Sequence, residues 1–212
     1  MTMSLRRWNQ HRRRKDARDW EAFVIYRQVV TGTGILIVMI GLPASGKTTA
    51  AKRLQLERNA LRLTPDEWMI PLFAEPEANG KRDILEGRFV WLALEAIRGG
   101  TNVILDFGVW SRDERTALRV LASEVGATCE LVYMRVDFDE LRTRLNHRNT
   151  SDSDTTFKIT DAELETFRKF FVEPDTLELS GTHLDPPPPE YQTWRDWAAQ
   201  RWPTSNETGI SG

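Results

Sequence analysis

Residues 41–48 read Gly-Leu-Pro-Ala-Ser-Gly-Lys-Thr, and few folds can accommodate this octapeptide. An apolar run, Ile35–Ile40, precedes it, and helix-forming residues continue from Thr49 to Leu54. The spacing G-x-x-x-x-G-K-[ST] is the P-loop pattern, in which glycines let backbone N–H groups converge at the start of a helix. The sequence therefore predicts a strand, a tight loop and a helix in immediate succession.

A loop of this kind suits a phosphate group. Its amides and the positive end of the helix dipole face the anion, a lysine reaches the outer phosphates, and a hydroxyl serves Mg²⁺. Here Lys47 is the lysine and Thr48 carries the hydroxyl. The alternative is a glycine-rich turn without a ligand. The predicted nucleotide-binding residues are Gly41, Pro43, Ala44, Ser45, Gly46, Lys47, Thr48 and Thr49.

Composition restricts the class of protein. The chain has 212 residues, of which 40% are hydrophobic and 28% charged, as expected for a globular domain. No apolar run approaches the roughly 18 residues of a membrane helix. One Cys and three His argue against a disulfide framework or a zinc site and favour a reducing compartment, so we expect a cytoplasmic protein.

Strand-like and helix-like segments alternate along the chain, which predicts an open α/β architecture. We expect a P-loop NTPase fold with three α/β/α layers, a mostly parallel five-stranded sheet and an arginine-bearing lid. The five expected strands cover residues 35–40, 61–63, 102–106, 129–136 and 176–180. The expected organisation is a basic N-terminal extension (1–33), a kinase-like domain (34–182) and a Pro/Trp-rich segment packing on that domain (183–212).

Two carboxylates follow predicted strands, at the edge where such sheets bind ligands. Asp106 ends an apolar strand downstream of the P-loop, an arrangement that helps to hold Mg²⁺; it could also be an ordinary turn residue. Asp66 stands at the second position of a predicted helix, where its charge favours the helix dipole. Alternatively, Asp66 binds the substrate and accepts the proton of an acceptor hydroxyl as a general base.

Two pairs of arginines also lie near this edge. Arg112 and Arg115 fall in the first turn of a predicted helix, where a cation opposes the dipole; we interpret them as substrate-binding residues, with solvated surface arginines as the alternative. Arg144 and Arg148 lie four residues apart on one helix face, before a polar stretch. That position predicts a catalytic role, in which the guanidinium groups neutralise charge on a transferring phosphoryl group.

The sequence resembles the P-loop kinases of the AAA_33 or "predicted kinase" group, which are similar to the 5′-hydroxyl kinase domains of polynucleotide kinases, chloramphenicol phosphotransferase and zeta toxins. The resemblance covers about residues 35–180 and depends on the P-loop, on Thr64–Trp68, on Ile104–Arg112 with Arg115, and on Leu141–Asn149. It implies ATP- and Mg²⁺-dependent phosphorylation of a hydroxyl, with Asp66 as base and Arg144 and Arg148 as lid arginines.

Taken together, these features predict a phosphotransferase that moves the γ-phosphate of ATP to a hydroxyl of a small molecule. Lys47, Asp66, Arg144 and Arg148 are the predicted catalytic residues, and Thr48 and Asp106 the predicted metal ligands. Neither the acceptor nor the oligomeric state follows from the sequence. Residues 1–19 hold seven basic against two acidic residues, so a polynucleotide 5′-hydroxyl kinase is one alternative, although nucleic acid is not the favoured partner. A nucleotide-dependent switch or binding module without an acceptor is the other.

Overall fold

The computed structural model describes residues 32–150, 157–181 and 183–206. The predicted basic extension, residues 1–33, lies outside the described residues except for its last two positions. Within the described residues, no helix is long and apolar enough to span a lipid bilayer.

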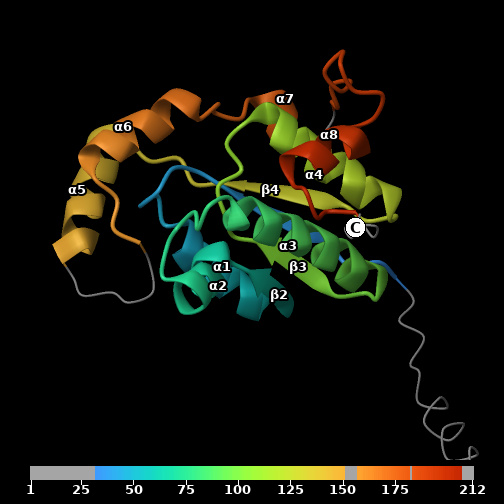
Figure 1. Cartoon of the computed structure of the whole chain (residues 1–212). Coiled ribbons are helices and arrows are strands. Elements are labelled where there is room, and N and C mark those ends of the chain that lie inside the picture. Colours follow the sequence, from blue (N-terminus) through green and yellow to red (C-terminus); the bar gives the residue numbers. More distant parts are fainter. Residues whose placement is uncertain (1–31, 151–156, 182, 207–212) are drawn as a thin grey trace, which may run out of the picture. The chain divides into compact units, whose positions relative to one another are not determined.

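Strands and helices alternate through the first two thirds of the described chain, and helices alone follow (Figure 1). The elements are β1 (Leu36–Ile40), α1 (Lys47–Glu57), β2 (Ala60–Leu63), α2 (Pro65–Phe73), α3 (Lys81–Arg98), β3 (Asn102–Leu105), α4 (Arg112–Glu124), β4 (Cys129–Tyr133), α5 (Phe138–Thr150), α6 (Asp161–Phe170), α7 (Thr176–Leu179) and α8 (Trp194–Arg201).

All four strands are parallel and lie in the order β2-β3-β1-β4. In this register Leu36 of β1 has Val103 of β3 on one side and Cys129 of β4 on the other. The central position of β1 explains why it is continuously apolar: both of its faces and both of its edges are covered. The P-loop, which follows β1, therefore leaves the sheet at the carboxyl edge between β3 and β4.

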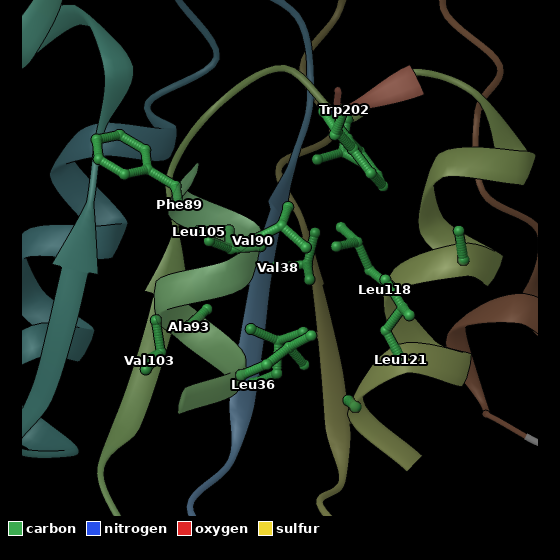
Figure 2. Close-up of a cluster of buried hydrophobic side chains, with 14 of the residues drawn as sticks. Leu36, Val38, Phe89, Val90, Ala93, Val103, Leu105, Leu118, Leu121 and Trp202 are labelled. Carbon is green, nitrogen blue, oxygen red and sulfur yellow. The ribbon is translucent and has the colours of Figure 1, made fainter. Parts of the chain in front are cut away.

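Alternate side chains of β1 belong to two different hydrophobic clusters, one on each face of the sheet. Leu36, Val38 and Ile40 pack with α3, α4 and α8, whereas Ile37 and Met39 pack with α1. Figure 2 shows the larger cluster, with Val38 between Val90 of α3 and Leu118 of α4. This arrangement confirms the predicted α/β fold with helices on both faces of a parallel sheet.

The expected fifth strand is wrong, because the described residues contain four strands and residues 176–179 form the helix α7. Asp175 caps this helix by accepting a hydrogen bond from the Glu178 amide at 2.8 Å. Glu178 is then drawn into the interior, where it is 2% exposed and paired with Arg115. The Leu-Glu-Leu alternation suggested a strand, but the cap and this buried ion pair determine the conformation.

A third hydrophobic cluster attaches α5 and α6 to the P-loop. Leu141 and Leu145 of α5 and Leu164 of α6 are buried against Leu42, which lies within the loop itself. An ion pair of 2.8 Å between Arg142 and Glu165 joins the two helices. This packing places the arginine-bearing end of α5 beside the loop.

At the other end of the chain, α8 packs on the same core as α3 and α4. Trp194 and Trp202 are 5% and 0% exposed, and their rings meet that of Trp197 edge-on at 5.7 and 5.9 Å. The three tryptophans of this Pro/Trp-rich segment thus cover an edge of the hydrophobic core.

Candidate functional site

The backbone of residues 41–46 adopts the conformations that a phosphate-binding loop requires. Gly41 has φ 147° and Gly46 has φ 92°, both in the region that favours glycine. A Cβ atom at Gly41 would lie 2.7 Å from Ser45 Oγ and 3.0 Å from the carbonyl oxygen of Met134, so a side chain cannot fit there. The loop therefore packs tightly against the residues that follow β4. Helix α1 begins directly at Lys47.

Two polar side chains of the loop are held in positions that suit an anion. Lys47 Nζ donates to the carbonyl oxygen of Leu42 at 2.8 Å, and burial lowers the pKa of its ammonium group to about 8. Ser45 Oγ is buried and has no hydrogen-bond partner among the described residues. A buried hydroxyl without a partner, beside a desolvated ammonium group, fits a loop whose polar groups are satisfied by bound phosphate.

The predicted metal ligands lie together at the carboxyl ends of β1 and β3. Thr48 Oγ1 donates to Asp106 Oδ1 at 3.4 Å, and Asp106 is 4% exposed. Its second oxygen, Oδ2, accepts from Arg62 Nη1 at 2.9 Å and from Thr64 Oγ1 at 3.3 Å. A hydroxyl and a carboxylate oxygen are the hard donors that Mg²⁺ prefers when phosphates complete its coordination, so these residues fit the ion.

A cavity of about 920 Å³ opens beside the P-loop and joins it to α2, α3, α5, α6 and α8. The loop and the sheet edge contribute Lys47, Thr48 and Asp106. Asp66, Arg144 and Arg148 line the same cavity, so the structure brings together the residues selected from the P-loop, from the ends of two strands and from α5. The space is large enough for a nucleotide and a second small molecule.

Asp66 lies on the cavity wall contributed by α2 and is held by an arginine of α3. Arg82 Nη1 donates to Asp66 Oδ1 at 2.9 Å, and Arg82 Nε donates to Glu86 Oε1 at 3.1 Å. The Asp66 side chain is 34% exposed and therefore accessible from the cavity. Asp66 and Arg148 are both close enough to Lys47 to influence its charge. A carboxylate and the P-loop lysine thus line the same cavity and interact electrostatically.

The two predicted lid arginines reach the cavity from α5. Arg144 Nη2 forms an ion pair of 2.5 Å with Glu140, one helical turn earlier. Arg148 Nη2 donates to the carbonyl oxygen of Phe157 at 3.5 Å. Burial lowers the pKa of the Arg148 guanidinium group, and the nearby Asp66 carboxylate partly offsets this effect. A desolvated guanidinium group interacts strongly with an anion that enters the cavity.

Arg112 and Arg115 do not line the cavity, so the structure gives no support to their role in binding the acceptor, which stays a prediction. Arg115 is 0% exposed; it pairs with Glu178 and donates to the carbonyl oxygens of Trp110 and Val172, both at 3.0 Å. Arg112 forms ion pairs of 2.6 Å with Asp175 and with Asp185. The guanidinium groups do bind anions, but the anions are carboxylates of the chain's own C-terminal segment.

Sequence reasoning missed several charged residues around Asp66 and Asp106, among them Arg62, Arg82, Glu86 and Arg201. Arg62 precedes Thr64 at the end of β2, so the rule that weighs residues at strand ends could have found it. Arg82 and Glu86 lie four apart on α3, a spacing that indicates an ion pair but not a cavity. Arg201 is far away in sequence, and its ion pair with Asp83 spans 118 residues.

Known proteins match the part of the chain that contains the P-loop. Residues 36–174 match the family model AAA_33, described as an AAA domain. A probable adenylyl-sulfate kinase from Aeropyrum pernix is 28% identical over 114 residues, which are 51% of this chain. The chain spans 62% of the length of that relative.

Two solved structures share the fold. A crystal structure from Chloroflexus aurantiacus, whose assignment as a kinase is itself provisional, has a TM-score of 0.57 at 16% identity and covers 83% of this chain and 100% of its own. The structure of Chaetomium thermophilum Kti12 in complex with ADP-AlF3 has a TM-score of 0.51 at 18% identity, covering 81% and 99%. At these identities the likeness concerns the fold alone.

Proposed function

Because the chain belongs to the AAA_33 family, within the related group of P-loop kinases, we propose that it transfers the γ-phosphate of ATP to a hydroxyl of a small molecule. Family membership supports nucleotide-dependent phosphotransfer. The acceptor hydroxyl, the use of ATP and the dependence on Mg²⁺ are the finer parts of the proposal. They are supported by the residues that line the cavity beside the P-loop.

The donor half of the site would be formed by the P-loop and the end of β3. Lys47 and the amides of residues 41–49 bind the triphosphate, and the orphaned Ser45 hydroxyl gains a partner. Thr48 and Asp106 would hold Mg²⁺, which when bound neutralises charge on the transferring phosphoryl group. Arg62 and Thr64 fix the Asp106 carboxylate, so that Oδ1 stays directed at Thr48.

The observation that carries the proposal is the position of Asp66. A carboxylate that lines the same cavity as the P-loop lysine, near enough to act on its pKa, has the chemistry needed to accept the proton of an attacking hydroxyl. Its ion pair with Arg82, made through Oδ1, orients the carboxylate. Arg144 and Arg148 lie where they can neutralise charge on the phosphoryl group as it moves between donor and acceptor.

The proposal is tested with Asp66→Asn, which keeps the size of the side chain and removes the base. Phosphate transfer to an acceptor should fall by roughly 10²–10⁴-fold, the usual contribution of a general base. ATP affinity should stay within a few-fold of the wild-type value, as measured by equilibrium binding. Transfer that survives the substitution would show that Asp66 is not the base.

Lys47→Ala is the matched control for the donor half. It should abolish binding that depends on the triphosphate, because the ammonium group faces the outer phosphates in a loop of this type. Unchanged ATP binding by this variant would contradict the assignment of the loop itself. Nucleotide hydrolysis that proceeds equally with and without acceptor, and survives Asp66→Asn, would instead identify a nucleotide-dependent switch.

A further inference from the structure

The wall of the cavity that carries Asp66 is built from interlocked charged side chains. We name it the acceptor wall and define it by six residues that line the cavity: Asp66, Arg82, Asp83, Glu86, Glu114 and Arg201. They come from α2, α3, α4 and α8, which are widely separated in sequence. None of them belongs to the P-loop, and α8 lies beyond the segment that matches the family model.

Ion pairs connect the acceptor wall from end to end. Arg82 bridges Asp66 and Glu86 at 2.9 and 3.1 Å. Arg201 bridges Asp83, Glu86 and Glu114 at 2.8, 3.6 and 2.7 Å. Two guanidinium groups therefore form ion pairs with four carboxylates. A fifth carboxylate, that of Glu77, also lines the cavity. The wall has an excess of negative charge.

Burial strengthens the electrostatic effect of this excess negative charge. The Glu86 and Glu114 side chains are only 5% and 8% exposed, so water screens their charges weakly. Burial raises the pKa of the Glu86 carboxyl to about 7, against the opposing effects of Arg82 and Arg201, so Glu86 is partly protonated near pH 7 and adds less than a full negative charge to the wall. The positive charges of Arg82 and Arg201 do not fully neutralise the carboxylates of the acceptor wall.

The opposite side of the same cavity has the reverse charge. Lys47, Arg144, Arg148 and Lys158 line it around the P-loop and the α5 and α6 helices, together with the two carboxylates of Asp106 and Glu163. The basic side suits a triphosphate. An acceptor has to approach the acidic side, where a further anion would be repelled and a cation attracted.

One donor in the cavity has no partner of its own. Trp110 lines the cavity, and its Nε1 atom is buried without a hydrogen-bond acceptor among the described residues. Its backbone amide donates to Glu114 at 2.7 Å, which ties the residue to the acceptor wall. The Nε1 atom itself lies against Gly108, where an added Cβ atom would come within 2.8 Å of it, so the indole ring shapes this part of the cavity wall.

We propose that the acceptor is a polyhydroxyl compound that carries a protonated amine and no anionic group. This inference rests on the proposed phosphotransferase function. Wall carboxylates accept hydrogen bonds from the hydroxyls and the ammonium group, while Arg82 and Arg201 keep the carboxylates in place. Acceptors that are polyanions, such as the 5′ end of a nucleic acid, are excluded by the charge of the wall.

The test compares acceptors that differ in charge but share a six-carbon skeleton. Transfer from γ-labelled ATP with Mg²⁺ is measured to D-glucosamine, D-glucose and D-gluconate, and within a wider panel of amino, neutral and acidic polyols and a 5′-hydroxyl oligonucleotide. The amine-bearing class should have kcat/KM roughly tenfold above the neutral class, the effect of one favourable charge interaction. Faster transfer to the acidic polyols or to the oligonucleotide would overturn the inference.

Asp83→Asn supplies the matched variant, because it removes one charge from the wall while keeping its shape. KM for amine-bearing acceptors should rise roughly threefold, as for a half-exposed ion pair, and KM for neutral acceptors should change much less. Asp139→Asn is the control, since Asp139 lies on α5 with a side chain 92% exposed and does not line the cavity. An unchanged ratio of the two KM values in Asp83→Asn refutes the role of the wall.

Different experimental results would refute the phosphotransferase function and the proposed charge of the acceptor. If an acidic polyol or the oligonucleotide takes up phosphate and Asp66→Asn abolishes that transfer, the phosphotransferase function stands and the charge of the acceptor is wrong. If no compound of any class takes up phosphate while ATP still binds in a Lys47-dependent manner, the phosphotransferase proposal falls and the inference falls with it.

Discussion

Glu86→Gln should change the way in which folding stability depends on pH. The Glu86 side chain is 5% exposed and lies between Arg82 and Arg201. Burial is the largest influence on its carboxyl group and raises the pKa from 4.5 to about 7, although both arginines act in the opposite direction. The native protein therefore binds a proton at Glu86 over a pH range in which the unfolded chain has released it.

The sign and size of the effect follow from proton linkage. A carboxyl group whose pKa is higher in the folded state stabilises the fold fully below its unfolded pKa, here 4.5. That contribution is lost as the pH rises to the folded pKa of about 7. One pKa unit corresponds to about 1.4 kcal/mol, so the shift amounts to about 3 kcal/mol. Because Gln cannot titrate, the variant does not lose this part of its folding stability as the pH rises.

Urea unfolding of both proteins at intervals between pH 4.5 and 8 measures the difference directly. The free energy of unfolding of the wild type, minus that of Glu86→Gln, should fall by about 3 kcal/mol across the range and level off near pH 8. Glu95→Gln, on a more exposed position of the same helix, controls for a general effect of the substitution. A difference that stays constant with pH would refute the argument that Glu86 is buried without full compensation.

Two other predictions concern single charged groups. Arg115→Ala should destabilise the protein by about 3–5 kcal/mol in urea unfolding, because Glu178 would remain buried without its partner; the double variant Arg115→Met/Glu178→Leu should recover most of that loss, and no recovery would contradict the reason given. ATP affinity should fall by up to about tenfold per pH unit above pH 8, where the Lys47 ammonium group loses its proton. Lys47→Arg should lack this dependence, and an equal slope in both proteins would argue against Lys47 as its origin.

The donor half of the site was predictable because the residues that form it are neighbours in the sequence. The apolar strand, the glycines and the lysine of residues 35–49 are contiguous, and each requires the same strand–loop–helix unit. The rule that ligands bind at the carboxyl edge of a parallel sheet then directed attention to Asp66 and Asp106. Both line the cavity together with Lys47. Their catalytic and metal-binding roles stay predictions.

The acceptor wall was not predictable, because its contacts join residues that are far apart in sequence. Arg201 reaches Asp83 across 118 positions and Glu114 across 87. Charge and helical spacing alone make Arg201 an ordinary residue on the polar face of a terminal helix. Only the packing of Trp202 and its neighbours on α3 and α4 brings the guanidinium group into the cavity.

The arginines of α4 have anionic partners that the sequence alone did not identify. Cations in the first turn of a helix oppose its dipole, so an anion had to explain Arg112 and Arg115. The anions are Asp175, Asp185 and Glu178. A third arginine, Arg119, donates to the carbonyl oxygen of His183 at 2.8 Å, which extends the row along the helix.

This row of arginines fastens residues 172–181 and 183–185 to α4, just before the chain continues to α8. Trp194 begins α8 and donates from its indole to the carbonyl oxygen of Asp185 at 2.9 Å, so the anchor and the helix are directly joined. The other end of α8 then delivers Arg201 to Glu114, at the start of α4. Arg112 and Arg115 therefore act on the acceptor wall indirectly, by holding the segment that completes it.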